Sequence, residues 1–528
     1  MDRRERSDRS TGSERRRVRF APSPTGPLHM GGVRTALYNY LYAKQAGGDF
    51  IIRIEDTDSQ RFVPGAEEYI IETLNWCGII PDEGVDESGK VVEIPSEKHP
   101  HAPYRQSQRR GIYRKYAEDL VARGYAYYAF DTAEELTALR TEAESRKKTF
   151  TYNWETRGSL RNSLTLPADE VRRLVETEKN WTIRFKIPEN RTVQMDDLIR
   201  GHIEVNSSTL DDKVLWKRAD ELPTYHLANI VDDHLMEITE VIRGEEWLPS
   251  LPLHYLLYEA FGWQESQPRF AHLSLLLKPD GKGKLSKRDG DRLGFPVFPL
   301  RWVNSEGEVS RGYREDGYYP EAFVNMLALL GWNPGDDREL FTIEELIPAF
   351  SLERVIKSGA RFNADKAKWF NQEYLRKRTT AQLVEDFKKI NSEKLEGFSD
   401  EYIGAVVDLM KERAHFITEM WDLTSYFFEA PSAYDEASAA KFWKEEARGA
   451  MPEVRATIAA LEPFTKENIE ETLHELITSK EWPMGKIMNS LRLFLVGVSK
   501  GPGVADMMAL FGKEETLRRI DTAISKLS

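Results

Sequence analysis

Residues 19–32 constrain the fold of this chain more than any other stretch, because they join a strand to a helix through a stiff loop. Before the loop, Val18 and Phe20 alternate with arginines, which is typical of a strand. The loop contains three prolines and ends in a glycine pair, after which apolar residues recur at helical spacing. The apolar run over residues 49–56 then suits a buried parallel strand. This order predicts one βαβ unit of a nucleotide-binding sheet.

The glycine pair, Gly31 and Gly32, predicts an anion site at the start of the helix. N–H groups at a helix N-terminus bind phosphate, and glycines leave no side chain in front of them. His29 precedes the pair and is placed to donate to the same anion. On this stretch alone a second interpretation stays open, in which a proline-rich turn carries a histidine that only caps the helix.

Composition sets the broad class of protein. A chain of 528 residues is too long for one core, so we expect three or more domains. No apolar run is long enough to span a bilayer. The single cysteine, Cys77, excludes an intrachain disulfide and a multi-cysteine zinc site, and it favours a reducing compartment such as the cytoplasm. Residues 1–17 are rich in arginine and serine but also carry acids, which favours a disordered tail over a transit peptide.

The net charge of −13 argues against nucleic-acid binding over the whole surface, but it allows a local basic face. Such a face is predicted within residues 353–378, where eight basic residues stand against three acidic ones. Phe362, Trp369, Phe370 and Tyr374 are interleaved with them, which suits contact with an RNA backbone and stacking on bases. A solvated helix face above a core stripe is an equally good interpretation.

The second half of the sheet is predicted after residue 222, with strands near 237–247 and 270–276 and a helix between them. It leads into the loop Lys284-Leu285-Ser286-Lys287-Arg288, which is bounded by glycines and expected to be mobile. Between the halves, residues 125–221 alternate short strands with charged helices, which indicates an α/β insertion. Beyond Pro320 the pattern is almost wholly helical.

Two signatures resemble those of class I aminoacyl-tRNA synthetases: the proline-rich loop that ends in His29 and the glycine pair, and the lysine loop further along the chain. Five stretches in the right order make the resemblance specific to the glutamyl-tRNA synthetases, namely residues 19–32, 53–58, 104–107, 223–225 and 242–247. Gly32 stands where many class I enzymes have a histidine, so one phosphate contact is absent or comes from the backbone.

The fold class that the resemblance implies is α/β: a Rossmann-like class I synthetase catalytic domain split by an α/β insertion, then an all-α anticodon-binding region. We expect a disordered tail at 1–17, the catalytic domain at 18–110 and 223–275, an acceptor-stem-binding insertion at 111–222, a lysine-loop and helical connecting domain at 276–378, and an all-helical anticodon-binding domain at 379–528. Residues 289–319 look longer than the usual linker and receive no role.

The implied reaction joins L-glutamate to the 3′ end of its tRNA through a glutamyl-adenylate, with activation only when tRNA is bound. The first nucleophile is the α-carboxylate, already an anion, so catalysis consists of positioning and charge stabilisation. ATP is a substrate and Mg²⁺ neutralises the leaving pyrophosphate. Residues 127–131 offer no sulfur, so we expect no zinc, and no residue is expected to be a metal ligand. The implied partners are glutamate tRNA, L-glutamate and ATP, with no membrane, and the implied state is a monomer.

The resemblance also implies site residues. The expected catalytic residues are His29, Lys284 and Lys287. The expected ATP contacts are His29, Gly31, Gly32, Lys284, Ser286 and Lys287. For glutamate, Arg19 is expected to pair with the γ-carboxylate, helped by Tyr225 and Asn229. Arg243 is expected to hold the α-carboxylate, and Glu55 and Ser23 the ammonium group, with Ala21 as a further glutamate contact. Bidentate pairing with a carboxylate explains arginine rather than lysine.

Several alternatives are weighed against this hypothesis. A glutaminyl-tRNA synthetase is the nearest, but Ser23 and Thr25 resemble the glutamyl branch, and glutaminyl enzymes end in β-barrels. A truncated paralogue that glutamylates a tRNA base lacks an anticodon domain. A nucleotidylyltransferase without an RNA partner does not explain the lysine loop, and an inactive tRNA-binding protein does not explain the intact signatures. Whether the enzyme also charges glutamine tRNA stays open.

Overall fold

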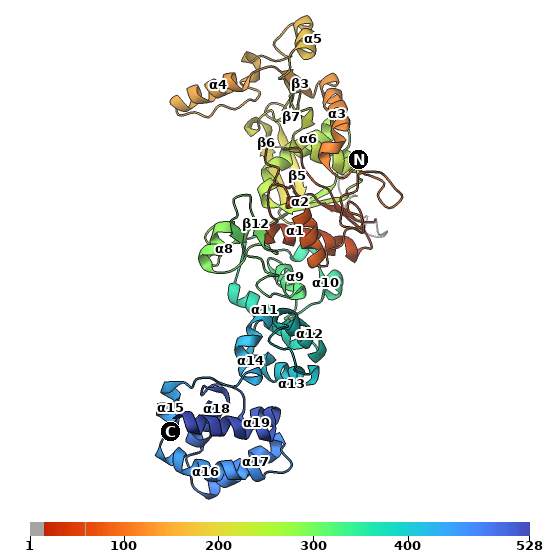
Figure 1. Ribbon diagram of the computed structural model, residues 1–528. Helices are drawn as coiled ribbons and strands as arrows, with labels where there is room; N and C mark the ends of the chain where they lie inside the picture. Colours follow the sequence, from red (N-terminus) through yellow and green to blue (C-terminus); the bar gives the residue numbers. More distant parts are fainter. Residues whose placement is uncertain (1–14, 59, 528) are drawn as a thin grey trace. The chain divides into compact units, whose positions relative to one another are not determined.

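The computed structural model of the chain describes residues 15–58 and 60–527, which form two compact units (Figure 1). The first unit comprises Met1–Asp316 and Pro320–Ala364, and the second comprises Gly317–Tyr319 and Asp365–Ser528. Among the described residues, no helix is both long and apolar enough to cross a membrane.

A six-stranded sheet forms the centre of the first unit, with the strand order β2-β1-β9-β10-β5-β6. Five of its strands run parallel: β5, described below, and β1 (Arg17–Phe20), β2 (Asp49–Ile52), β9 (Glu240–Gly244) and β10 (Arg269–Leu273). Helix α1 (Met30–Gln45) connects β1 to β2 and packs against both strands. This arrangement confirms the βαβ unit and the Rossmann-like sheet predicted from the sequence.

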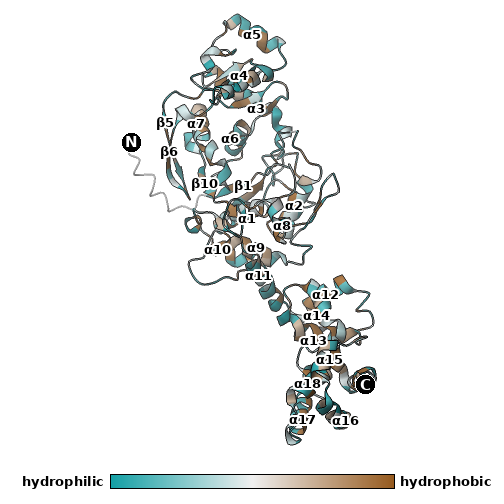
Figure 2. Cartoon of the chain, turned by 90° about the vertical axis from the view of Figure 1, so that its left-hand side faces the viewer, coloured by the Kyte–Doolittle hydropathy of each residue, from teal (hydrophilic) through white to brown (hydrophobic). Residues whose placement is uncertain are grey.

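Apolar residues explain the burial of β1 and β2. Val18, Phe50, Ile51 and Ile52 are completely buried, and β1 lies beside α1 in Figure 2. Strands that are buried on both faces have apolar runs rather than an alternating pattern, which is why the sequence predicted a parallel sheet here.

A hairpin completes the sheet on one side. Strands β5 (Thr192–Asp197) and β6 (Gly201–Asn206) are antiparallel to each other, and β5 runs parallel to β10, where Asp197 pairs with Phe270. The hairpin falls within the insertion expected at residues 111–222, yet its strands belong to the central sheet. Alternation of exposed and buried residues, as in β5, does not distinguish an insertion strand from a strand at a sheet edge.

The two edges of the sheet differ. Beside β2, Ile52 donates its N–H to the carbonyl of Glu83 at 3.0 Å. A Cβ on the next residue, Gly84, would lie 2.1 Å from the carbonyl oxygen of Ile52, and its φ is +106°, so glycine is required at this close approach. At the other edge, β6 exposes His202 and Glu204 to solvent.

The insertion has a four-stranded antiparallel sheet of its own, ordered β3-β4-β7-β8. Its elements are β3 (Ala126–Ala129), β4 (Thr182–Phe185), β7 (Val214–Lys217), β8 (Leu222–Pro223), α3 (Arg110–Ala122), α4 (Ala133–Ser145) and α5 (Ala168–Thr177). The buried carboxylate of Asp212 accepts hydrogen bonds from the hydroxyl of Tyr127 at 2.6 Å, Nη1 of Arg157 at 3.2 Å and the N–H of Ile187 at 3.0 Å. It therefore joins three segments of the insertion.

The other elements of the first unit surround the sheet or follow it in the chain. They are α2 (Ala66–Trp76), α6 (Tyr225–Leu235), α7 (Leu251–Phe261), β11 (Leu276–Leu277), α8 (Lys287–Leu293), β12 (Trp302–Val303), β13 (Val309–Ser310), α9 (Pro320–Leu329), α10 (Ile343–Ala349) and β14 (Ala360–Arg361).

The second unit contains only helices among its described residues, which confirms the predicted all-α C-terminal region. They are α11 (Ala364–Lys377), whose first residue belongs to the first unit, α12 (Thr380–Asn391), α13 (Asp400–Met410), α14 (Met420–Phe428), α15 (Glu436–Phe442), α16 (Glu445–Ala460), α17 (Lys466–Ser479), α18 (Met484–Val496) and α19 (Val504–Leu527).

Residues 15–17 belong to the folded unit rather than to the tail expected at residues 1–17. Arg17 begins β1, and its guanidinium donates to Asp49 at 3.1 Å and to the carbonyl of Met236 at 2.6 Å. Two neighbouring segments thus hold this arginine in place. The rest of the expected tail, residues 1–14, lies outside the described residues.

We predict that Asp212→Ala destabilises the insertion by about 3–5 kcal/mol, because the Arg157 guanidinium loses its buried carboxylate partner and the Tyr127 hydroxyl and the Ile187 N–H lose their acceptor. Hydrogen exchange over β3 and β7 measures this local stability directly. The neighbouring Asp211, which is partly exposed beside Lys213, provides the matched control Asp211→Ala. Equal exchange rates in the two variants would contradict the role given to Asp212.

Candidate active site

The carboxyl ends of the parallel strands bring the predicted amino-acid residues to one edge of the sheet. Arg19 lies near the end of β1, Arg243 lies near the end of β9, and Glu55 follows β2. Tyr225 and Asn229 project from α6, which precedes β9 in the chain. Ligands bind at this edge of open α/β sheets.

Arg19 forms a buried bidentate pair with Asp233. Its Nε and Nη2 lie 3.0 and 3.1 Å from the two carboxylate oxygens. The same carboxylate accepts from Nη1 of Arg53 at 2.7 Å. Burial alone would raise the pKa of Asp233, but the two guanidinium groups outweigh it and lower the pKa. Arg19 is therefore fixed in one orientation.

Asp233 and Arg53 are residues that the sequence analysis missed. Arg53 is completely buried although it lies in an apolar run, and a charge in such a run requires a buried partner. The position of Arg53 in an apolar run indicates that it has a buried acidic partner. The sequence does not show which carboxylate that partner is.

Glu55 accepts hydrogen bonds from Nη2 of Arg53 at 3.1 Å and from Nδ2 of Asn229 at 3.3 Å. Burial raises the pKa of Glu55, and Arg53 and Arg19 oppose that rise. Oδ1 of Asn229 is buried and has no hydrogen-bond partner among the described residues. This end of the site offers acceptor atoms to a ligand.

Arg243 contacts neutral groups. Its Nη1 donates to the hydroxyl of Tyr225 at 2.9 Å and lies 3.3 Å from Nδ1 of His254, while its Nε donates to Nε2 of His272 at 3.0 Å. Nη2 is buried and unpartnered in the part of the chain that the structure describes. The ring of Tyr225 is stacked on Trp247 with centroids 4.1 Å apart.

His29 is the N-cap of α1. Its Nδ1 accepts a hydrogen bond from the N–H of Gly31 at 3.1 Å, so a neutral imidazole carries its proton on Nε2. The cap thus selects the tautomer whose Nε2–H is able to donate to an anion. His29 therefore caps the helix through Nδ1, and this role is compatible with donation from Nε2–H.

The N–H groups at the start of α1 already have partners. Met30 donates to the carbonyl of Val297 at 2.9 Å, Gly31 donates to the ring of His29, and Gly32 donates to the carbonyl of His29 at 2.8 Å. The prediction of free N–H groups at Gly31 and Gly32 is therefore corrected. A phosphate at this helix end has to share or replace these bonds.

The loop before α1 is closely packed. A Cβ on Gly32 would lie 2.5 Å from Cδ1 of Leu28, which explains a glycine here on steric grounds. Ala21 is partly buried, and Ser23 is exposed with its carbonyl accepting the N–H of Thr25 at 2.8 Å. The residue between them, Pro22, accepts the N–H of Glu55. This loop thus borders the glutamate end of the site.

The lysine loop runs from β11 into α8. Nζ of Lys284 lies 3.8 Å from a carboxylate oxygen of Glu246, and both side chains are about half exposed. Ser286 caps α8, and its hydroxyl donates to Asp289 at 2.5 Å. Lys287 is the first residue of α8, and its side chain lies outside the described residues.

The two signatures adjoin each other. A Cβ placed on Gly31 would lie 3.7 Å from Cδ1 of Leu276 in β11. The carbonyl of Leu276 accepts the N–H of Leu285, at the centre of the lysine loop, at 2.8 Å. The start of α1 and the lysine loop thus both contact Leu276 of β11.

Part of the long linker, residues 295–300, also lies against this region. The ring of Phe298 meets that of His29 edge-on with centroids 6.2 Å apart. The carbonyl of Leu300 accepts from the hydroxyl of Tyr69 at 2.6 Å. This part of residues 289–319, for which no role was predicted, therefore packs against the capping histidine.

The predicted basic and aromatic stretch at 353–378 is only partly a solvent-facing surface. Phe362 is buried in the first unit, and Phe370 is buried in the second. In α11, Nζ of Lys366 lies 3.7 Å from the ring centroid of Trp369, and Arg376 pairs with Glu373. The core interpretation therefore holds for the two buried phenylalanines.

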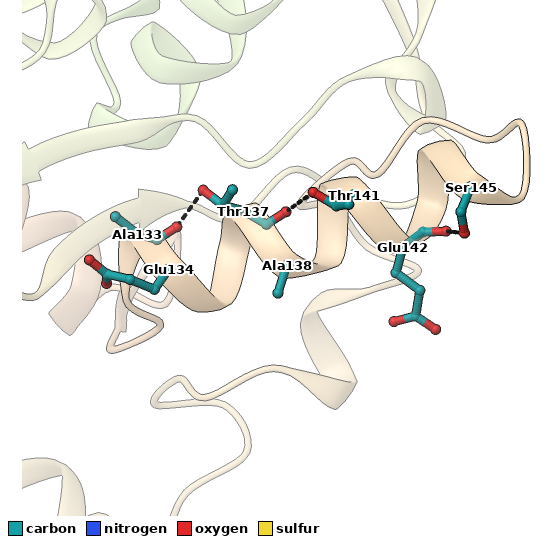
Figure 3. A pocket seen from close by; sticks show the side chains of 7 residues that line it. All are labelled: Ala133, Glu134, Thr137, Ala138, Thr141, Glu142 and Ser145. Atoms are coloured by element: carbon teal, nitrogen blue, oxygen red, sulfur yellow. Dashed lines mark hydrogen bonds between the residues drawn. The ribbon is translucent and has the colours of Figure 1, made fainter.

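Neither a cluster of potential metal ligands nor the hollow on α4 extends this site among the described residues. Among the described residues, no three His, Cys, Asp or Glu side chains are grouped to hold a metal ion. The absence of zinc stays a prediction. A shallow hollow lies along a single face of α4, and its charged side chains, Glu134 and Glu142, do not suit a phosphate (Figure 3).

Comparisons with known proteins place the chain in a family. Residues 16–369 match the family model "tRNA synthetases class I (E and Q), catalytic domain", and residues 379–524 match an anticodon binding domain. The chain is 55% identical to a glutamate–tRNA ligase of Porphyromonas gingivalis, covering 98% of this chain and 99% of that protein. It is 56% identical to one from Phocaeicola vulgatus, covering 98% of this chain and all of that protein.

A solved structure agrees with these matches. The crystal structure of a glutamate tRNA ligase from Elizabethkingia meningosepticum in complex with its amino acid has a TM-score of 0.92 and 54% identity, covering 98% of this chain and all of that one. These findings confirm the resemblance seen in the sequence. The chain therefore belongs to the class I tRNA synthetases of the E and Q type and, within them, to the family of these glutamate–tRNA ligases.

Proposed function

We propose that this protein ligates L-glutamate to the 3′ end of glutamate tRNA, with ATP as the second substrate. The observation that carries the proposal is the pair of buried arginines, Arg19 and Arg243, that flank Tyr225 at the carboxyl edge of the sheet. Two guanidinium groups and one carboxylate, Glu55, match the two carboxylates and one ammonium group of glutamate. The full-length similarity to glutamate–tRNA ligases supports the same assignment.

In the first step, an oxygen of the glutamate α-carboxylate attacks the α-phosphorus of ATP, and the bond to pyrophosphate breaks. The attacking group is already anionic, so the protein supplies orientation and positive charge rather than a base. His29 donates through Nε2–H, and Lys284 and Lys287 bring cations on the adjoining loop. Mg²⁺ would enter with ATP and would neutralise charge on the leaving pyrophosphate.

In the second step, the 2′ hydroxyl of the terminal adenosine attacks the carbonyl carbon of the adenylate and AMP leaves. Glutamine is rejected because its neutral amide forms a weaker hydrogen bond with the guanidinium of Arg19, which Asp233 holds in place, than the γ-carboxylate of glutamate does. The single cysteine favours a reducing, cytoplasmic setting, and we assign the protein a monomeric state, which light scattering would measure.

Parallel charging of purified glutamate and glutamine tRNAs with glutamate tests this function. We expect charging of glutamate tRNA, and ATP–pyrophosphate exchange only when that tRNA is present. Charging of glutamine tRNA as well would identify a non-discriminating enzyme. Charging with glutamine instead of glutamate would contradict the proposal, and full exchange without tRNA would remove the tRNA requirement.

We predict that Arg19→Ala raises the KM for glutamate about 100-fold or more and leaves the KM for ATP nearly unchanged, because a buried charge pair with the substrate is lost. Aminoacylation kinetics with each substrate varied in turn measure this split. Arg191→Ala, at a half-exposed arginine paired with Glu259, is the surface control. Unchanged glutamate kinetics in the Arg19 variant would overturn the pocket assignment.

We predict that His29→Asn keeps the fold but lowers kcat for adenylate formation about 10²- to 10³-fold. Asparagine is a good N-cap, so the hydrogen bond from the N–H of Gly31 survives, whereas the donor to the phosphate is removed. Thermal unfolding and pyrophosphate exchange separate the two effects. In His29→Ala both the cap and the donor are lost, and full activity of the asparagine variant would show that His29 acts only as a cap.

A further inference from the structure

Behind Arg243 lies a second layer of buried polar groups, made by His272 on β10 and Asp197 at the end of β5. The Nε of Arg243 donates to Nε2 of His272 at 3.0 Å, and Nδ1 of His272 lies 2.6 Å from Oδ2 of Asp197. The side chains of His272 and Asp197 are fully buried. Three neighbouring strands, β9, β10 and β5, therefore contribute one residue each to a chain of hydrogen bonds.

The chemistry of these groups fixes the tautomer of His272. A guanidinium only donates, so Nε2 has to accept and the proton resides on Nδ1, from which it is donated to Asp197. Burial lowers the pKa of His272, so the ring is neutral at physiological pH. Asp197 is itself held by the N–H groups of Ile199 at 3.0 Å and Arg200 at 2.8 Å.

The two arginines of the site are held in different ways. Arg19 is paired directly with the carboxylate of Asp233, whereas the groups that touch Arg243 are two imidazoles and a phenol hydroxyl. Among the described residues, no carboxylate forms an ion pair with Arg243. Its Nη2 is buried and unpartnered, so one edge of this cation remains open to an anion.

A neutral hydrogen-bond partner such as His272 leaves the charge of Arg243 free to bind an anionic ligand. A carboxylate in direct contact with Arg243 would satisfy its charge and compete with the carboxylate of a ligand. A histidine fixes the guanidinium through Nε without neutralising it, and the buried cation then gains its partner only when an anion binds. The aspartate keeps the histidine in its accepting tautomer from one residue further away, as in catalytic triads, where loss of the aspartate charge yields the wrong tautomer.

We propose that His272 and Asp197 are positioning residues for the amino acid substrate, which hold Arg243 toward a carboxylate of glutamate and leave its charge uncompensated. This inference rests on the proposed function. Neither residue touches the reacting atoms. Both act through Arg243.

The test uses the full chain with saturating glutamate tRNA. In Asp197→Asn, the amide is able to donate to Nδ1 and so favours the tautomer that no longer accepts from Arg243. We expect the KM for glutamate to rise about 10- to 100-fold, with less than about a threefold change in the KM for ATP. The adjacent, exposed Asp196, which pairs with His202, provides the matched control Asp196→Asn, which should leave both constants unchanged.

Two amide analogues of glutamate identify the carboxylate that is affected. As inhibitors of charging, the α-amide and the γ-amide each lack one charge. Asp197→Asn should reduce the preference for glutamate over one of the two amides, because Arg243 is displaced from one carboxylate, and leave the preference over the other amide unchanged. A loss of both preferences, or equal losses in glutamate and ATP affinity, would indicate a general structural role and overturn the proposal.

A second variant guards against misfolding. His272→Gln retains one acceptor and one donor, so it should keep more glutamate affinity than His272→Leu, which retains neither. Equal kinetics in the two variants, or wild-type glutamate kinetics in Asp197→Asn, would also overturn the proposal. Failure of the wild-type chain to charge any tRNA with glutamate would instead contradict the proposed function, so the two failures are distinguishable.

Discussion

The arrangement of the first unit depends on how two adjacent acids, Asp232 and Asp233, compensate buried arginines. Asp233 accepts from Arg19 at the end of β1 and from Arg53 after β2. Asp232 accepts from Arg109, just before α3, at 2.8 Å. Removing an ion from water costs several kcal/mol, which close and well-oriented partners offset. Because both acids lie on α6, this helix has one position in which all these charges are satisfied.

The same constraint divides the cations of the site into two kinds. Those that hold the fold together, such as Arg53, are enclosed by carboxylates within 2.7–3.8 Å. Arg243 is held by neutral nitrogen and oxygen atoms instead. A buried guanidinium group that lacks an anion is costly for the empty protein, and that cost is offset when an acidic ligand arrives. Fold stability thus favours arginines whose charge is neutralised, such as Arg53, whereas ligand binding favours an arginine whose charge is not, such as Arg243.

The local part of the fold was predictable because it depends on short-range patterns. The strand, loop and helix around residues 19–32 follow from apolar spacing and from proline and glycine positions. The boundaries of α7 agree with its apolar run, which ends at Phe261 before Gly262. The resemblance to a known family then grouped Arg19, Arg243 and Tyr225, and the strand order does bring them to one edge of the sheet.

What could not be predicted depends on which distant segments become neighbours. The partners Asp233 and His272 follow from strand and helix packing, about which residue spacing says nothing. The N–H of Met30 is satisfied by Val297, which is remote in the chain, so the start of α1 looked open in the sequence. The β5–β6 hairpin joined the central sheet for the same reason.

The two edges of the central sheet have a consequence for how the protein behaves in concentrated solution. An exposed strand edge is a template on which another chain adds a strand and begins to aggregate. At β2 that route is closed by the segment at Glu83 and Gly84, which lies so near that a methyl group would not fit. At β6 the exposed imidazole of His202 and the exposed carboxylate of Glu204 lie 3.3 Å apart, and charged side chains on an edge strand disfavour pairing with another chain. The sheet therefore resists edge-to-edge self-association at both of its ends.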